Sequence, residues 1–281
     1  MNLKVSFLII IIFTSFNCTK KLSLTVKELW RTKAVFATPE SVLYNAKEKI
    51  LYVSNINGKP IERNKKGYIS KLSLEGTVLN QKWITGLNAP KGMGMYKRFL
   101  YVTDIDSLVK IDIASGKIQK RYGIMGAIYL NDIAIDNSGK VYISDMKTRN
   151  MFIFDGKSVS HYHSLPDGTI SNGLFIEKEY LFVGTNRGVM RINLKNKKIR
   201  LMNQKIGGID GLKKIGKKMF ITSDWKGKVE IVKNGNVAIL IDTTSKKVNA
   251  ADFEYIPKKK LIIIPTFFDN RVVAYSLNGV K

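Results

Sequence analysis

Alternating apolar and polar residues divide most of this chain into short strands. The pattern is clearest in Asn131–Asp145, where alternating isoleucines precede the turn Asn137-Ser138-Gly139 and the apolar run Val141-Tyr142-Ile143. Period-two apolar residues on both sides of a polar, glycine-containing turn predict a β-hairpin. A polar residue, Asn131, opens this hairpin. No long amphipathic helix is predicted after the first two dozen residues.

The same hairpin pattern recurs six times along the chain. The polar residues that open the six copies are Glu40, Lys91, Asn131, Asn172, Asp210 and Asp252, and we call them the openers. Successive openers lie 51, 40, 41, 38 and 42 residues apart. A third strand follows each hairpin, and a fourth, more polar strand usually comes after it. A period near forty with four strands per unit is typical of a β-propeller, so we expect an all-β, six-bladed β-propeller.

The sixth copy ends at Tyr275-Ser276-Leu277 without a fourth strand, whereas Leu24–Arg31 is an extra strand at the start of the pattern. We expect this N-terminal strand to complete the last blade, because that arrangement closes the ring and removes an exposed edge. The propeller is therefore predicted to span residues 24–281. A series of β-sandwiches is the alternative, but it would not explain the shared period.

Residues 1–18 are predicted to lie outside the fold. Lys4 precedes an apolar run over Val5–Phe13, which is too short to span a membrane and fits a signal peptide. Cys18 at the end of this segment resembles the cysteine of a bacterial lipobox, which is lipidated after cleavage. Residues 19–23 would then be a short linker. Plain signal cleavage and an uncleaved anchor are the alternatives, and in each case the domain is exported to the periplasm or outer cell envelope.

The composition adds a strong positive charge, because 47 Lys and Arg residues against 22 Asp and Glu residues leave a net charge of +25. Such an excess attracts anionic surfaces. The lysines are dispersed in turns, however, which is typical of a solvated surface, and no nucleic-acid-binding motif is present. A single cysteine excludes an intramolecular disulfide. The only two histidines, His161 and His163, are predicted to be surface or half-buried strand residues. We expect a monomer.

The openers are predicted to meet at the centre of the ring, because the innermost strand of each propeller blade lines the central channel. Glu40, Asp210 and Asp252 bring three negative charges, Lys91 one positive charge, and Asn131 and Asn172 bring amide oxygens. Carboxylate and amide oxygens suit one hard divalent cation, with Ca²⁺ the favoured ion. Any single Asn or Asp at a strand start commonly satisfies backbone donors instead, but a shared register in several repeats favours a polar site.

Four phrases in this order resemble the family of gluconolactonase, senescence marker protein and luciferin-regenerating enzyme: Pro39-Glu40-Ser41-Val42, Leu130-Asn131-Asp132, Ser171-Asn172-Gly173-Leu174 and Ile209-Asp210-Gly211-Leu212. That family is a six-bladed propeller with one divalent metal in its channel. The resemblance implies that Glu40, Asn172 and Asp210 are metal ligands, and that Asn131 is a fourth ligand or a substrate contact. It further implies that Asp210 is the base that activates water to hydrolyse a cyclic ester.

The chain departs from the family pattern at one position. Enzymes of the family usually carry an arginine two residues before the asparagine that matches Asn131, and this chain has Tyr129 there. A sugar lactone is therefore in doubt as the substrate. Lys91 either takes over a polarising, catalytic role or balances charge, and Tyr129 and Asp252 are candidate substrate contacts. Further apolar residues could line the site, although packing in the core or rim is favoured for them: Met93, Met95, Trp225, Phe267 and Phe268.

Two functions follow from these patterns. The favoured hypothesis is a lipid-anchored, divalent-metal-dependent lactonase or esterase of the cell envelope, with a small-molecule ester or lactone as substrate. The alternative is a non-catalytic propeller lipoprotein that binds a partner or polyanion and holds a structural ion in its channel.

Overall fold

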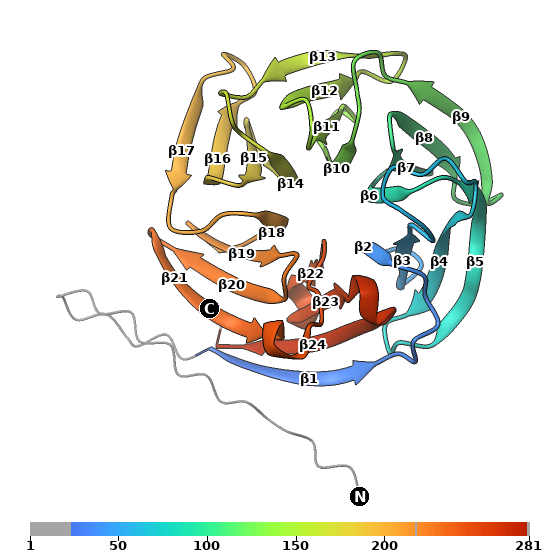
Figure 1. Cartoon of the computed structure of the whole chain (residues 1–281), viewed down its shortest axis with the longest axis vertical. Helices are drawn as coiled ribbons and strands as arrows, with labels where there is room; N and C mark the ends of the chain where they lie inside the picture. Colours follow the sequence, from blue (N-terminus) through green and yellow to red (C-terminus); the bar gives the residue numbers. More distant parts are fainter. Residues whose placement is uncertain (1–23, 217, 280–281) are drawn as a thin grey trace, which may run out of the picture.

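The computed structural model describes residues 24–216 and 218–279, and their strands form six four-stranded antiparallel sheets arranged as blades around one axis (Figure 1). The predicted all-β, six-bladed propeller is therefore confirmed. Cys18 and the predicted signal peptide and linker lie outside the described residues. No helix in the described part of the chain is long and apolar enough to cross a membrane.

Each blade runs from an inner strand outwards, and its strands follow in chain order. Blade 1 contains β2 (Pro39–Asn45), β3 (Ile50–Asn55), β4 (Gly67–Ser73) and β5 (Val78–Leu87). Blade 2 contains β6 (Pro90–Tyr96), β7 (Phe99–Asp104), β8 (Ser107–Asp112) and β9 (Lys117–Gly123). Blade 3 contains β10 (Leu130–Ile135), β11 (Val141–Asp145), β12 (Asn150–Phe154) and β13 (Val159–Ser164).

Blades 4 and 5 repeat this order, whereas in blade 6 the N-terminal strand takes the outermost place. Blade 4 contains β14 (Ser171–Glu177), β15 (Tyr180–Thr185), β16 (Gly188–Asn193) and β17 (Ile199–Asn203). Blade 5 contains β18 (Ile209–Gly216), β19 (Met219–Asp224), β20 (Lys228–Lys233) and β21 (Asn236–Asp242). Blade 6 contains β22 (Glu254–Ile256), β23 (Leu261–Pro265), β24 (Val272–Asn278) and β1 (Thr25–Arg31). Three short 3-10 turns complete the structure: Thr244–Lys246, Pro257–Lys259 and Phe267–Asp269.

The N-terminal strand closes the ring as the sequence predicted. Strand β1 pairs antiparallel with β24 from Thr25 opposite Asn278 to Arg31 opposite Val273, and Figure 1 shows it as the outermost strand of that blade. Trp30 of β1 also donates its indole N–H to the carbonyl oxygen of Leu74, 2.9 Å away in blade 1. The first and last segments of the chain are thus held together, and β24 has no open edge.

The hydrophobic core is distributed between neighbouring blades rather than concentrated in one centre. Each of six buried apolar clusters joins two neighbouring blades, for example Tyr52 and Ile69 of blade 1 with Val102 and Val109 of blade 2. The inner strands are buried along most of their length because both of their faces pack against neighbouring blades. The channel at the centre is left to the polar openers.

Glycine follows the opener where the next blade comes too close for a side chain. A Cβ on Gly173 would lie 2.2 Å from the carbonyl oxygen of Asp210, and a Cβ on Gly92 would lie 2.5 Å from the Cα of Asp132. Both distances are shorter than any real Cβ contact. Glycine at these positions therefore allows the inner strands to pack closely, which brings neighbouring openers together.

Candidate functional site

A β-bulge lies at the opener of every inner strand from β2 to β18. The strand register shifts at this point in all five hairpins. A bulge opposes two residues to one and turns a side chain out of the regular alternation, so it is common beside functional sites. The five openers in these bulges are all buried: Glu40, Lys91, Asn131, Asn172 and Asp210.

Hydroxyl groups on the second strands hold these bulges in place. Ser144 Oγ accepts a hydrogen bond from the Asp132 N–H at 3.0 Å and donates to the carbonyl oxygen of Asn172, 2.8 Å away in the next blade. One buried hydroxyl thus fixes the bulge of its own blade and the opener of the next. Ser54, Thr103 and Ser223 occupy the same position on their second strands. Of these two kinds of hydrogen bond, Ser223 makes both, Ser54 accepts only the one from its own bulge, and Thr103 donates only the one to the next blade.

An acidic or amide residue directly after this hydroxyl fixes the loop that leads into the inner strand. Asp145 Oδ2 accepts hydrogen bonds from the Ile128 and Tyr129 N–H groups at 2.8 and 3.2 Å. Asp104 does the same for the loop before Lys91. These positioning residues were not identified from the sequence. A hydroxyl residue followed by an acidic or amide residue recurs at the end of four second strands and could have indicated them: Ser54-Asn55, Thr103-Asp104, Ser144-Asp145 and Ser223-Asp224.

A cavity of about 430 Å³ opens at the end of the channel where the inner strands begin. Its five polar lining residues are the five bulge openers, and its other seven are apolar or aromatic: Ile56, Pro60, Tyr129, Met146, Trp225, Phe267 and Phe268. The openers thus converge on one cavity as the sequence predicted, although they come from five different blades. Asp252, the sixth opener, is not among the lining residues.

Four openers that line the cavity present buried oxygen atoms without a hydrogen-bond partner: Glu40 Oε2, Asn131 Oδ1, Asn172 Oδ1 and Asp210 Oδ2. Asp252 Oδ1 also has no partner, but Asp252 does not line the cavity. Asn172 Nδ2 donates to Asp210 Oδ1 at 2.5 Å, which ties two of these residues together across 38 positions of sequence. Unpartnered buried acceptors carry a large desolvation cost, so such atoms call for a ligand. Two carboxylates and two amides form the kind of oxygen set that a hard cation prefers.

The cavity cannot be identified as a metal site from its histidine, cysteine and acidic residues alone. Among residues 24–216 and 218–279, no group of three or more His, Cys, Asp or Glu side chains is arranged to hold a metal. The set above contains only two such residues, and its other two members are asparagines. A cation site here therefore depends on the amide oxygens.

Burial dominates the electrostatics of the two cavity carboxyls. It raises the pKa of Glu40 well above the usual range, and the carboxyls of Asp210 and Asp252 raise it further while Lys91 opposes them. Burial and the Asp252 carboxyl also raise the pKa of Asp210 to about 8, against the hydrogen bond from Asn172. Without a cation the cavity therefore favours protonated carboxyls at neutral pH.

Lys91 lies against Tyr129, the residue that departs from the family pattern. The Lys91 ammonium is 4.7 Å from the centre of the Tyr129 ring. It donates to the carbonyl oxygens of Pro60 and Ala89 at 2.8 and 3.0 Å. Burial lowers the pKa of Lys91 to about 8, although Glu40 and Asp104 oppose this. The ammonium is thus held at the cavity wall by carbonyl and ring contacts.

Asp252 lies behind the cavity wall instead of on it. Its Oδ2 accepts a hydrogen bond from Ser41 Oγ at 2.5 Å, and its backbone N–H donates to the Glu40 carbonyl oxygen at 3.0 Å. Burial raises its pKa to about 6, with Lys213 opposing the shift. The substrate contact expected of Asp252 does not agree with this position. Asp252 instead joins blade 6 to blade 1 beneath the openers.

Three aromatic side chains form the apolar wall of the cavity. Trp225, Phe267 and Phe268 pack edge to face, with ring centres 4.8 to 5.6 Å apart. Core or rim packing was the favoured expectation for them, and Phe267 does pack in a buried cluster with Ile56 and Ala251. All three rings also line the cavity. The expectation holds for Met93 and Met95, which belong to the apolar cluster between blades 1 and 2.

The two histidines lie far from the openers. His161 and His163 are on β13, the outermost strand of blade 3. His161 is exposed and its Nε2 lies 3.0 Å from Ser164 Oγ, while His163 is half-buried. The structure does not bring either ring into the cavity.

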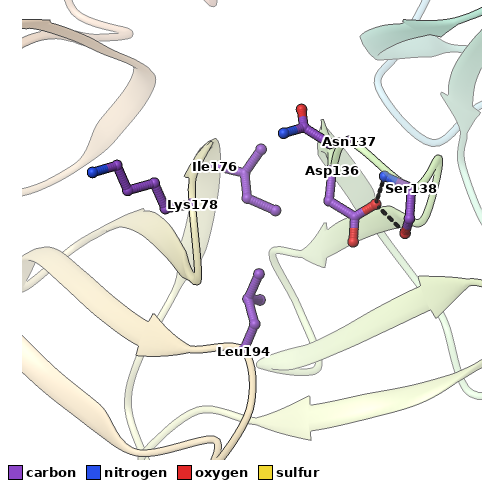
Figure 2. Close-up of a pocket in the computed structure, with 6 residues that line it drawn as sticks. All are labelled: Asp136, Asn137, Ser138, Ile176, Lys178 and Leu194. Atoms are coloured by element: carbon purple, nitrogen blue, oxygen red, sulfur yellow. Dashed lines mark hydrogen bonds between the residues drawn. The ribbon is translucent and has the colours of Figure 1, made fainter.

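A second, shallower depression of about 220 Å³ lies between the hairpin turns of blades 3 and 4. Figure 2 shows Asp136 bonded to Ser138 within its own turn, with Ile176 and Leu194 nearby and Lys178 extending away. The carboxylate of Asp136 is thus used to hold a turn. This depression contains no converging set of unpartnered polar atoms, unlike the cavity at the openers.

Comparison with known proteins confirms the fold. A streptogramin B lyase structure matches with a TM-score of 0.66 and 11% identity over 91% of this chain and 98% of that chain. A provisionally named gluconolactonase matches with a TM-score of 0.66 and 14% identity over 90% and 92%. A catalytically inactive virginiamycin B lyase variant from Staphylococcus aureus with quinupristin matches with a TM-score of 0.63 and 11% identity over 90% and 99%. No family model and no curated protein sequence matches the chain.

Proposed function

We propose that this protein is a divalent-metal-dependent hydrolase of the lactonase or esterase type, acting at the cavity formed by the openers. The observation that carries this proposal is the convergence of four unpartnered buried oxygens from four different blades. Buried acceptors without partners are costly, so this arrangement favours a bound ligand. The likeness to a protein named as a gluconolactonase is consistent with a hydrolase on this fold.

The proposed cation ligands are Glu40, Asn131, Asn172 and Asp210, and Ca²⁺ is the proposed ion. These residues fit such a cation because their free atoms are all hard oxygens and because two carboxylates supply negative charge. A bound divalent cation would supply Lewis acidity towards the carbonyl oxygen of the substrate.

The chain's own residues supply the remaining chemistry. In this proposal the Asp210 carboxylate takes a proton from the attacking water, whose oxygen forms a bond to the acyl carbon. The bond between that carbon and the ring or alcohol oxygen then breaks, and the leaving oxygen receives the proton that Asp210 took from the water. Lys91 holds a positive charge at the cavity wall, where it favours negative charge on the reacting oxygens. Asn131 and Tyr129 are the proposed substrate contacts.

A lyase reaction is less well supported. In one matching lyase structure, replacement of a single histidine accompanies a catalytically inactive protein. The only two histidines of this chain lie on β13, outside the cavity. A mechanism that needs a histidine at the channel therefore lacks its residue here, whereas the base proposed for hydrolysis is present as Asp210.

Cation binding by the full chain is the direct test. Calorimetric titration of the metal-free protein with Ca²⁺ should show one ion bound per chain in the micromolar range or tighter. Glu40→Gln should weaken binding by at least about tenfold, because it removes one of two carboxylates. Glu75→Gln, in an exposed turn of the same blade, is the matched control and should bind normally. Absence of any divalent ion at micromolar supply would overturn the proposal.

We further propose that the protein is exported and anchored to a membrane by a lipid on Cys18. The described chain begins on the side opposite the cavity, because Thr25 pairs with Asn278 and Leu277 donates its N–H to Lys260 in a hairpin turn. An anchor on this side would direct the cavity away from the membrane. Mass spectrometry of the mature protein should find a lipidated N-terminal Cys18, and an unmodified N-terminus would contradict the anchor.

The alternative of a non-catalytic, polyanion-binding propeller is favoured by one further observation. Every turn between an inner and a second strand carries an exposed lysine: Lys49, Lys97, Lys140, Lys178, Lys218 and Lys259. These turns share the face opposite the cavity and could contact an anionic surface. Metal-dependent hydrolysis that requires Asp210 would separate the two functions.

A further inference from the structure

Most of the exposed large apolar side chains lie at the cavity end of the propeller. Ten such residues are exposed in the described chain, and four of them lie on the outermost strands β1, β5, β17 and β21. The other six lie on loops at the cavity end of the propeller: Ile61, Met125, Ile128, Ile170, Trp225 and Phe268. We call these six residues the apolar collar. None of the ten is in a hairpin turn on the opposite face.

The collar continues into the cavity through the aromatic wall. Trp225 is 41% and Phe268 64% exposed, whereas Phe267 between them is only 6% exposed. Phe267 packs in a buried cluster with Ile56 and Ala251, so the wall rests on a rigid base. Asn249 Nδ2 also donates to the Trp225 carbonyl oxygen at 2.8 Å. The exposed aromatic faces are therefore held ready for an apolar ligand.

Once the four free opener oxygens bind a cation, the polar side of the cavity leaves few hydrogen-bonding groups for a sugar. The Lys91 ammonium already donates to two carbonyl oxygens, and Asn172 Nδ2 already donates to Asp210. A polyol lactone would have to bury several hydroxyl groups against the aromatic wall. Unpaired buried hydroxyls cost free energy, whereas alkyl or aryl groups gain it at such a surface.

We infer that the substrate carries an extended alkyl or aryl group, which lies on the aromatic wall and the collar while the ester or lactone carbonyl reaches the openers. This inference rests on the proposed hydrolase function and names its substrate class. A cavity of about 430 Å³ accommodates the reacting group and the first part of the apolar chain. The exposed faces of Trp225 and Phe268 would then cover the part of the chain that extends beyond the cavity.

The inference can be tested with a series of lactones that differ only in their alkyl chain. For the full chain supplied with Ca²⁺, kcat/KM should rise from γ-butyrolactone to γ-octalactone and γ-dodecalactone, by up to about fourfold per methylene group. D-Glucono-δ-lactone should be a poor substrate. Faster hydrolysis of gluconolactone than of γ-dodecalactone would overturn the inference and leave the hydrolase function intact.

Matched variants locate the effect on the aromatic wall. Phe268→Ala should lower kcat/KM for γ-dodecalactone by about tenfold or more, and that for γ-butyrolactone by a smaller factor, because only the longer lactone has an alkyl chain to lie on the wall. Leu79→Ala, which removes an exposed apolar side chain from the outer strand β5, should change neither value. Equal losses for both lactones in Phe268→Ala would contradict a role in recognising the chain.

Binding without turnover separates this inference from the proposed function. Unreactive γ-lactams with the same alkyl chains should quench tryptophan fluorescence, with affinity increasing along the series. The response should disappear in Trp225→Phe, because Trp30 and Trp83 lie outside the cavity. Chain-dependent lactam binding in a protein that hydrolyses no lactone would support the ligand class and refute the hydrolase. Chain-independent binding would refute the ligand class.

Discussion

Asp210→Asn is expected to abolish lactone and ester hydrolysis, with a fall in kcat of about a thousandfold or more. The substitution removes both the proposed base and one of the two cavity carboxylates. It keeps the size of the side chain and the oxygen that accepts the Asn172 hydrogen bond, so the propeller should remain folded. Steady-state kinetics with γ-dodecalactone would measure the loss, and circular dichroism would check the fold.

Asp155→Asn is the matched control for this experiment. Asp155 is exposed and accepts hydrogen bonds from Lys157 and Ser158 in a surface turn, so its replacement should leave hydrolysis within about twofold of the unmodified protein. If Asp210→Asn and Asp155→Asn both retained most of the activity, the cavity would not be the catalytic site. The polyanion-binding alternative would then be favoured.

The metal-free protein is expected to lose stability as the pH rises from about 4 to 8. An aspartate in the unfolded chain ionises near pH 4, whereas burial in the metal-free fold raises the pKa of Asp210 to about 8. Between these values the folded state binds more protons than the unfolded state, so the free energy of unfolding falls with increasing pH. Glu40, whose pKa burial also raises, acts in the same direction.

Thermal unfolding of the chelator-treated protein at pH 5 and pH 8 would measure this effect. The melting temperature should be lower at pH 8, and Ca²⁺ should raise it more at pH 8 than at pH 5, since ionised carboxylates bind the cation. Lys91 contributes in the opposite direction only above about pH 8, because burial lowers its pKa to that value. Asp210→Asn should flatten the pH dependence. A pH-independent melting temperature in the unmodified protein would contradict the electrostatics described for the cavity.

Much of the candidate site could be predicted because it repeats with the fold. Glu40, Asn131, Asn172 and Asp210 occupy one register position of a repeat, and the propeller axis brings such positions together. The aromatic wall could not be predicted in this way. Trp225 and Phe268 stand in loops of different blades, where no periodic pattern indicates which side chains turn towards the channel.

The limits of the sequence are clearest at Asp252 and Lys91. Asp252 matched the other openers in sequence, but its bond to Ser41 and its contact with the Glu40 backbone hold it behind the cavity. Lys91 was expected to act in catalysis or to balance charge. The structure adds that its ammonium is held by two carbonyl oxygens and the ring of Tyr129. Both positions depend on contacts between blades, which a single repeat does not encode.

The sequence by itself determined the number of blades, the closure of the ring by Leu24–Arg31 and the set of polar residues directed at the axis. These features follow from local alternation and from a period that repeats along the chain. Only the tertiary structure decided which openers share a cavity, how the bulges aim them, and which loops supply its apolar wall. Those decisions depend on hydrogen bonds and packing between blades, which join residues roughly forty positions apart or more.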